Sequence, residues 1–203
     1  GGRAEVSGKT LAYSGLTDGR APKGATGDLL LDPVSIDIVD GGSGTGGLTG
    51  STVYERDLEA QLANITLQAS GGTGYVRLND LTTDGVITLQ PNVSLTILAG
   101  NYNSGWYSSY TTTDVKDEIR ASGTGSIYIR AAMSITSGKM SSDTAEIKLW
   151  GDNGLTVGNS ITTHGGAVSL WADSDNYGGG TLTLDNGITP NRGSLLLGGG
   201  VGR

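Results

Sequence analysis

The sequence contains no cysteine and no phenylalanine, and only 4 of its 203 residues are proline. Without cysteine the chain can form neither a disulfide framework nor a thiolate metal site. Glycine is abundant, with 36 residues against an average of roughly 7 %. Because proline is so rare, this excess of glycine indicates neither a collagen-like chain nor a proline-rich linker. Aromatic residues make up 5 % of the chain, which suits a narrow interior filled by Val, Ile and Leu.

Positive charge is also scarce, since 13 Lys and Arg stand against 20 Asp and Glu and the net charge is -7. Nucleic acids and anionic membrane surfaces both attract basic faces, so the charge argues against either partner. No apolar run approaches the roughly 18 residues that a membrane-spanning helix needs. We therefore expect no nucleic-acid partner, no membrane insertion and a soluble extracellular protein. The sequence has neither an initiating Met nor a signal-peptide pattern, and we expect it to be a segment of a longer chain.

The chain is organised by a repeated pattern of short strands and tight corners, which is clearest between residues 143 and 198. Each strand alternates apolar and polar residues and ends on Gly, Asn or Asp. Alternation gives each strand an apolar face only two residues long, which no strand can bury alone. Stacked copies bury it because each one covers the next. The pattern predicts a β-solenoid with strands at Ile147-x-Leu149, Leu155-x-Val157, Val168-x-Leu170, Leu182-x-Leu184 and Leu195-x-Leu197.

The spacing of these strands favours a parallel β-helix. Leu67, Leu78 and Leu89 recur at equal intervals, and the interval from Leu149 to Leu170 is nearly twice as long. Two or three short strands in each turn of about 20 residues are typical of that fold. Antiparallel sandwiches also have strands at short, regular intervals, so the spacing alone does not decide. The tight corners and the lack of long hairpin strands favour the solenoid.

We expect a single all-β solenoid over residues 1–203, with an irregular, glycine-rich part at 1–50 and regular coils at 64–203. The irregular part holds weak strands around Val6 and Leu11-x-Tyr13.

A short helix is expected over residues 51–63. Either Ser51 or Thr52 could cap it, and Glu55 follows Thr52 by three residues, as in a capping box. Residues 100–118 interrupt the repeats and are expected to form an insertion.

Two groups of residues are candidate sites. Insertions in repeat proteins map to loops on one face, often the binding face, and Tyr and Trp are frequent interface anchors. The insertion's aromatic residues could therefore bind a glycan or a partner, or could fold back to cover the solenoid. Oxygen ligands that alternate before glycine resemble part of a calcium loop, although they also suit a tight corner. The aromatic candidates are Tyr102, Trp106, Tyr107 and Tyr110, and the calcium candidates are Asp173, Asp175 and Asn176.

The sequence gives no catalytic constellation. The single histidine, His164, has no recognisable nucleophile partner, so no triad is expected. A β-helix enzyme acting on polysaccharide would need carboxylates that converge on one groove. The acids that could line one face are Asp143, Asp152, Asp173 and Asp185, but their scatter is more typical of corner residues.

Three stretches resemble the haemagglutination-activity repeat region of filamentous-haemagglutinin-type exoproteins of two-partner secretion systems. They are DLLLDPVSIDI at 28–38, DLEAQLANITLQASG at 57–71, and the long stretch that opens with SITTHGGAVSLW at 160–200. The resemblance implies a right-handed parallel β-helix, export through an outer-membrane transporter and a place at the surface of a Gram-negative bacterium. It carries over no catalytic residue.

These observations predict a non-catalytic structural or adhesive module of a large secreted surface protein. It would serve as a stalk or as a self-assembling filament subunit, because open coil ends carry unpaired strand edges that invite end-to-end association. Its ligand would be a glycan or the surface of a host or neighbouring cell. No cofactor is expected apart from the calcium candidate. The alternative is a β-helix protein that binds or degrades polysaccharide.

Overall fold

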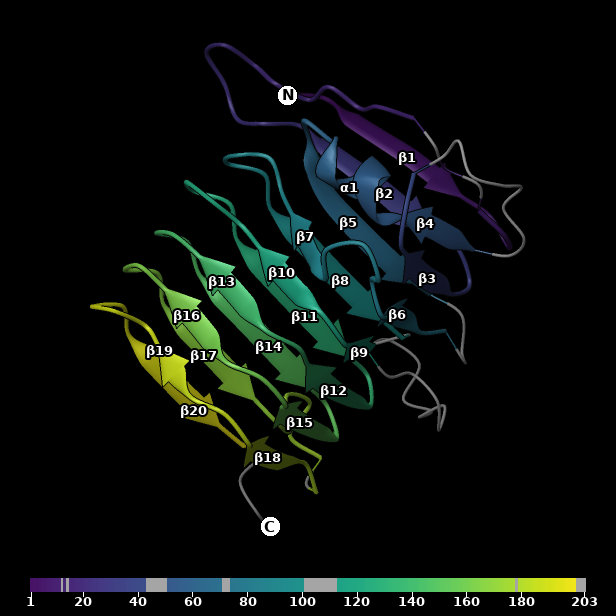
Figure 1. Cartoon of the computed structure of the whole chain (residues 1–203). Helices are drawn as coiled ribbons and strands as arrows, with labels where there is room; N and C mark the ends of the chain where they lie inside the picture. Colours follow the sequence, from purple (N-terminus) through teal and green to yellow (C-terminus); the bar gives the residue numbers. More distant parts are fainter. Residues whose placement is uncertain are drawn as a thin grey trace.

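The structure is a computed structural model, and the residues it describes form twenty short strands and one short helix. All strand pairings among them are parallel. The strands lie in three sheets, of which the eight-stranded sheet runs from the first strand, β1, to the last, β20 (Figure 1). The described residues are 1–11, 13, 15–42, 51–70, 74–100, 113–177 and 179–199.

The largest sheet has eight strands among the described residues and takes one strand from each coil. In spatial order they are β1 (Arg3–Ser7), β2 (Asp28–Asp32), β5 (Asn64–Ala69), β8 (Leu95–Ala99), β11 (Ile127–Ala131), β14 (Ile147–Gly151), β17 (Val168–Trp171) and β20 (Leu195–Gly198).

The other two sheets have seven and five strands within the described part of the chain. The seven-stranded sheet contains β18 (Thr181–Leu184), β15 (Gly154–Val157), β12 (Ser134–Ser137), β9 (Thr113–Val115), β6 (Val76–Leu78), β3 (Ile36–Val39) and β4 (Thr52–Tyr54). The five-stranded sheet contains β19 (Ile188–Thr189), β16 (Ile161–Thr163), β13 (Met140–Ser142), β10 (Glu118–Arg120) and β7 (Val86–Thr88).

From β5 onward, consecutive strands visit the eight-, seven- and five-stranded sheets in turn and then return to the first. The return is in register, so that Leu149 on β14 lies beside Leu170 on β17, as their separation in the sequence predicts. This topology of three parallel sheets is consistent with a parallel β-helix or solenoid. The predicted all-β class and the five predicted strand cores are confirmed.

The interior is a stack of aliphatic side chains that point inward from all three sheets. Leu67, Leu78 and Leu89, which recur at equal intervals, are at most 2 % exposed; the first two lie in β5 and β6, and Leu89 directly follows β7. Each inward position is covered by the matching position of the next coil, so burial continues along the stack.

The corners of successive coils approach very closely. A Cβ atom added to Gly166 would lie 1.9 Å from the carbonyl oxygen of Ala145 in the preceding coil. Real Cβ atoms do not approach an oxygen so closely, so only glycine fits at this corner. The abundance of glycine thus reflects the close stacking of the coils in addition to the conformations that the turns need.

The N-terminal residues join the stack, since β1 pairs with β2 and Arg3 lies beside Asp28. The weak strand predicted around Val6 is therefore confirmed. No strand is assigned to the described residues Leu11 and Tyr13, so that prediction is wrong, although both side chains are buried.

A buried glutamine ties this irregular segment to the stack. Tyr13 Oη donates to Gln61 Oε1 at 2.9 Å, and Gln61 Nε2 donates to the Gly15 carbonyl at 2.8 Å. Gln61 and Leu58 are 0 % exposed. Together with Leu11 and Tyr13 they close the N-terminal end of the interior.

The predicted helix is shorter than the range 51–63. The helix α1 spans Glu55–Glu59 and its N-cap is Tyr54, which makes no side-chain capping bond, so the predicted caps at Ser51 and Thr52 are wrong. Thr52 instead begins strand β4, in which Val53 pairs with Ile38. A strand forms here in place of the helix because it buries the Val53 side chain completely and gives the backbone N–H and C=O groups hydrogen-bond partners in the sheet.

The predicted insertion at 100–118 is also too long. Residues 113–115 form β9 and residues 118–120 form β10, and both pair with neighbouring coils. Residues 101–112 lie outside the described residues.

Candidate functional site

The outward faces of the three sheets differ in chemistry. The seven-stranded sheet presents a polar row that includes Arg77, Asp114, Thr136 and Thr156, which occupy matching positions on successive coils. The outward row of the five-stranded sheet is also polar and includes Arg120, Ser141 and Thr162. The outward positions of the eight-stranded sheet also include polar residues such as Thr96, Arg130 and Lys148, but among them are large apolar and aromatic side chains, namely Leu98, Tyr128, Trp150, Trp171 and Leu196. We call Tyr128, Trp150 and Trp171 the aromatic row.

The first two members of the aromatic row contact each other. The ring centroids of Tyr128 and Trp150 are 5.8 Å apart with an interplanar angle of 83°, an edge-to-face geometry. Lys148 lies beside Tyr128 in the ladder, and its Nζ is 5.8 Å from the Tyr128 centroid and 5.1 Å from the Trp150 centroid. Both rings therefore lie within cation–π range of the ammonium group.

Each tryptophan ring of the aromatic row is held by its indole N–H and leans over a small residue of the next strand. Trp150 Nε1 donates to Ser169 Oγ at 3.3 Å, and Trp171 Nε1 donates to the Asp173 carbonyl at 3.0 Å. A Cβ on Gly198 would lie 2.7 Å from Cδ2 and Cε3 of Trp171, so this ring covers Gly198. The indole N–H groups are satisfied within the protein, and both partly exposed rings keep an apolar surface toward solvent.

An ion pair borders the aromatic row where the eight-stranded sheet meets the seven-stranded sheet. Arg130 Nη2 lies 3.4 Å from Asp152 Oδ1, and the hydroxyl of Ser174 donates to the same oxygen. Asp152 is 7 % exposed, and this burial raises its pKa although Ser174 and Arg130 act in the opposite direction. The edge of the row thus offers a partly exposed guanidinium that a buried carboxylate holds in place.

The predicted calcium residues Asp173, Asp175 and Asn176 lie in the turn between β17 and β18, at this same corner. The Asp173 carbonyl accepts from Asn176 N at 3.3 Å, Asp175 Oδ1 accepts from Tyr177 N at 3.2 Å, and Asn176 has φ +60°. These bonds are those of a tight turn. Across the described ranges, no group of three or more His, Cys, Asp or Glu side chains is placed to hold a metal ion. The calcium role stays a prediction.

The predicted aromatic site, Tyr102, Trp106, Tyr107 and Tyr110, lies outside the described residues. The described ends of that segment are Gly100, directly after β8, and Thr113, the first residue of β9. These ends therefore lie where the chain passes from the eight-stranded to the seven-stranded sheet. Asp152 lies at the equivalent position two coils further along the stack.

The four carboxylates weighed for polysaccharide hydrolysis are not gathered in one place. Asp152 and Asp173 follow β14 and β17 at the junction of the eight- and seven-stranded sheets. Asp143 lies between β13 and β14, and Asp185 lies between β18 and β19, so each occupies a different corner. These four carboxylates thus do not converge on the single groove that hydrolysis would need.

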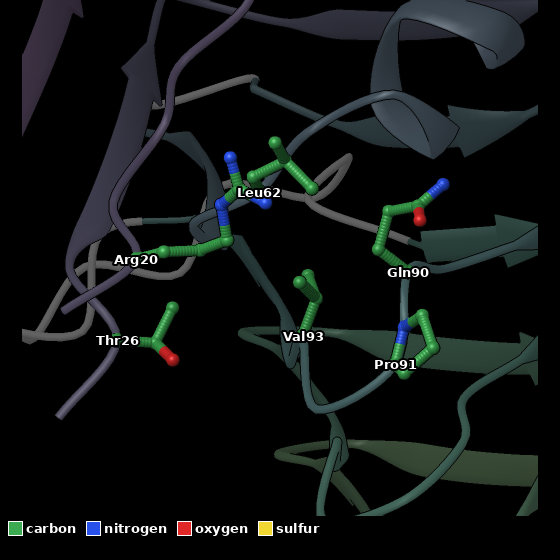
Figure 2. A pocket seen from close by; sticks show the side chains of 6 residues that line it. All are labelled: Arg20, Thr26, Leu62, Gln90, Pro91 and Val93. Atoms are coloured by element: carbon green, nitrogen blue, oxygen red, sulfur yellow. The ribbon is translucent and has the colours of Figure 1, made fainter. Parts of the chain in front are cut away.

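A pocket of about 250 Å³ lies between the N-terminal segment and the coil that contains β7. Its two charged or amide groups are already engaged, because Arg20 contacts both Asp18 oxygens, at 2.9 and 2.6 Å, and Gln90 Nε2 donates to the Glu59 carbonyl at 2.8 Å. The pocket therefore offers a ligand few free polar partners. Figure 2 shows its lining, Arg20, Thr26, Leu62, Gln90, Pro91 and Val93.

An acidic cluster surrounds the start of α1. Glu55 is 1 % exposed, and its Oε2 has no hydrogen-bond partner within the described part of the chain. Burial, followed by the charges of Asp84, Glu59 and Asp40, raises the pKa of Glu55 from 4.5 to about 7. The carboxyl is thus protonated in weakly acidic solution and hydrogen-bonds to Asp40.

Comparisons with known proteins identify no relative. A scan against protein-family models, a search of curated proteins and a search of solved structures each found no match. No helix among the described residues is long and apolar enough to cross a membrane.

The aromatic row was missed from the sequence because its members are far apart in the chain. Tyr128, Trp150 and Trp171 each follow the previous member by close to one coil, and each lies between or beside inward apolar residues. Outward aromatics that recur at the coil spacing are the signal that would have found them.

Proposed function

We propose that the chain is a non-catalytic, adhesive module of a secreted bacterial surface protein, and that the outward face of the eight-stranded sheet binds its ligand. The observation that carries the proposal is the aromatic row of Tyr128, Trp150 and Trp171; the described outward positions of the other two sheets hold no row of this kind. We further infer that the three sheets close into a right-handed parallel β-helix, as right-handed crossovers are nearly universal between parallel strands.

The chemistry of the face favours a glycan ligand. The negative faces of aromatic rings attract the polarised C–H groups of a sugar ring, and large apolar side chains with a few fixed polar groups are typical of ligand sites. Arg130, whose side chain is 28 % exposed, supplies hydrogen-bond donors for hydroxyls beside the rings, and the buried Asp152 holds it in place at 3.4 Å. Lys148 is balanced by Glu146 at 3.1 Å, so the face does not select strongly for charged sugars.

The resemblance to filamentous-haemagglutinin-type exoproteins supports the biological setting. Such a module would leave the cell through an outer-membrane transporter and act at the cell surface on glycans or on a neighbouring cell. The dispersed corners of Asp143, Asp152 and Asp185 support a binding role over hydrolysis.

The test is glycan-array screening followed by titration calorimetry with the best glycan. Replacing both tryptophans, Trp150→Ala and Trp171→Ala, should weaken binding at least about 10-fold, because aromatic anchors carry much of the energy at such surfaces. The matched control replaces two outward residues of the seven-stranded sheet, Thr156→Ala and Thr183→Ala, and should bind normally. Equal affinity of both double variants, with unchanged melting temperatures, would refute the proposed face.

A milder variant keeps every aromatic side chain. Gly198→Ala adds a methyl group where the Trp171 ring now lies, 2.7 Å from the ring atoms, and must displace the ring. We expect a shift in tryptophan emission and weaker glycan binding, with the rest of the stack intact. Unaltered emission would show that the ring does not cover Gly198 in solution.

A further inference from the structure

The outward residues of the eight-stranded sheet form files that cross the strands, because neighbouring strands pair in register. Arg130 on β11 aligns with Trp150 on β14, which aligns with Trp171 on β17, and all three side chains are partly exposed. We call these three residues the central file. Tyr128 lies one outward position earlier on β11, so it borders this file, and its ring makes an angle of 83° with that of Trp150. A ligand that follows the central file lies along the stack.

The Trp171 ring lies flat against the sheet. A Cβ built on Gly198, at an outward position of β20, would be 2.7 Å from Cδ2 and Cε3 of this ring and 3.0 Å from Cε2. A point at such similar distances from three adjacent ring atoms lies over the face of the ring, not beside its edge. The opposite face of the indole is therefore turned away from the sheet, where a sugar ring can stack on it.

The Trp150 ring leans in the same direction along the stack. Its Nε1 donates to Ser169 Oγ at 3.3 Å, and Ser169 lies on β17, the next strand of the sheet. Each indole thus reaches from its own coil toward the following one, so the two rings together cover a path across consecutive coils.

The cations beside this path are each paired with a carboxylate. Lys148 Nζ is 3.1 Å from Glu146, and Arg130 Nη2 is 3.4 Å from Asp152. The pairing weakens the attraction of both cations for an anionic ligand, while the partly exposed guanidinium can still donate to a hydroxyl. The strip therefore favours a neutral ligand.

From these features we infer that the ligand is a neutral, extended polysaccharide with equatorial links, such as a β-1,4-linked hexose chain, bound along the stack with one sugar unit on each coil. Neighbouring parallel strands are about 4.8 Å apart, close to the length of one sugar unit in such a chain. Both faces of a β-linked glucose unit carry axial C–H groups, so units that alternate in orientation stack equally well. The inference rests on the proposed function, because it concerns the same face.

The contacts along the central file assign one residue to each unit. Trp150 and Trp171 stack on two consecutive units, and Arg130 donates to a hydroxyl of the unit that follows on the β11 coil. A chain with axial links coils and cannot stay in line with three successive strands.

The test is titration calorimetry of the chain with cello-oligosaccharides of one to six units. We expect the affinity to rise at least about 10-fold up to about three units and then to level off, because aromatic contacts accumulate until the file is filled. Maltohexaose, which has the same sugar in an axially linked chain, should bind at least about 10-fold more weakly than cellohexaose. These measurements on the unmodified chain do not depend on any variant.

Variants at the two ends of the central file locate the ligand. Arg130→Ala and Trp171→Ala should each move the point at which affinity levels off from about three units to about two, since each removes a terminal contact. The matched control, Thr156→Ala with Thr183→Ala on the seven-stranded sheet, should leave the length profile unchanged. Melting temperatures show which variants are folded.

The outcomes separate this inference from the proposed function. Tryptophan-dependent binding in which one unit binds as tightly as three, or maltohexaose as tightly as cellohexaose, would overturn the inference and leave the proposed function standing. Binding of other glycans on the array, with none of the cello-oligosaccharides, would do the same. A length profile that folded Arg130→Ala and Trp171→Ala variants do not change would place the ligand elsewhere and overturn the inference. Absence of binding to every glycan would overturn both.

Discussion

Replacing Glu55 by glutamine tests whether a buried carboxyl makes the protein sensitive to pH. Glu55 is 1 % exposed beside Asp40, and burial raises its pKa from 4.5 to about 7. The folded chain therefore holds this proton more tightly than the unfolded chain. The contribution of Glu55 to the unfolding free energy is fully present below its pKa in the unfolded chain and is lost as pH rises through its pKa in the folded chain. The unfolding free energy should therefore fall between about pH 4.5 and pH 7.

The size of the effect follows from the shift. A rise from 4.5 to about 7 corresponds to at most about 3 kcal/mol of unfolding free energy. Because Asp40, Glu59 and Asp84 are partly or fully exposed, solvent screens part of their repulsion with Glu55, and we expect about 1 to 2 kcal/mol. Glu55→Gln removes the titration, and its amide can donate to Asp40, so at pH 8 the variant should be the more stable protein by that amount.

The assay is urea denaturation of both proteins from pH 5 to pH 8, read by tryptophan fluorescence. The difference in unfolding free energy should be small at pH 5 and should grow toward pH 8. Glu5→Gln, at an exposed glutamate on β1, serves as the control and should follow the native protein throughout. A constant difference between the native protein and the Glu55 variant across this range would refute the reasoning.

Two further predictions concern the stack itself. Leu149→Ala removes a fully buried side chain between two covering coils and should cost about 3 to 4 kcal/mol in denaturant unfolding, while the outward Thr156→Ala should cost less than about 0.5 kcal/mol. Gly166→Ala places a Cβ 1.9 Å from the Ala145 carbonyl and should cost about 2 kcal/mol or more. Gly187→Ala meets nothing within 4 Å and should be nearly neutral; similar melting temperatures for the two glycine variants would contradict the close corner.

The repeating part of the fold follows from the sequence because the coil spacing is a local property. Leu67, Leu78 and Leu89 recur at a fixed interval, and each burial depends only on the next coil. The strands of the five-stranded sheet are harder to see, since β16 and β19 contain only three and two residues. Such short strands carry too few alternations to be recognised without the ladder around them.

The irregular elements depended on contacts that the local pattern does not contain. Val53 fits a helical face with Leu58, but pairing with Ile38 in a distant strand places it in β4. The aromatic row was hidden for the same reason. Trp150 and Trp171 come together only through the register of β14 and β17, so proximity in the sequence directed attention to residues 100–118 instead.

The constant register of the eight-stranded sheet has a consequence for how such a protein can change in length. Ile147 lies beside Val168, so the stretch from Ile147 to Ala167 forms one complete coil. Deleting that unit would place β11 beside β17, and duplicating it would place a second β14 beside the first. In both cases the paired strands keep the same alignment, so the neighbouring ladders stay intact. Genetic gain or loss of a coil would therefore lengthen or shorten the row of exposed rings one tryptophan at a time, without a new fold.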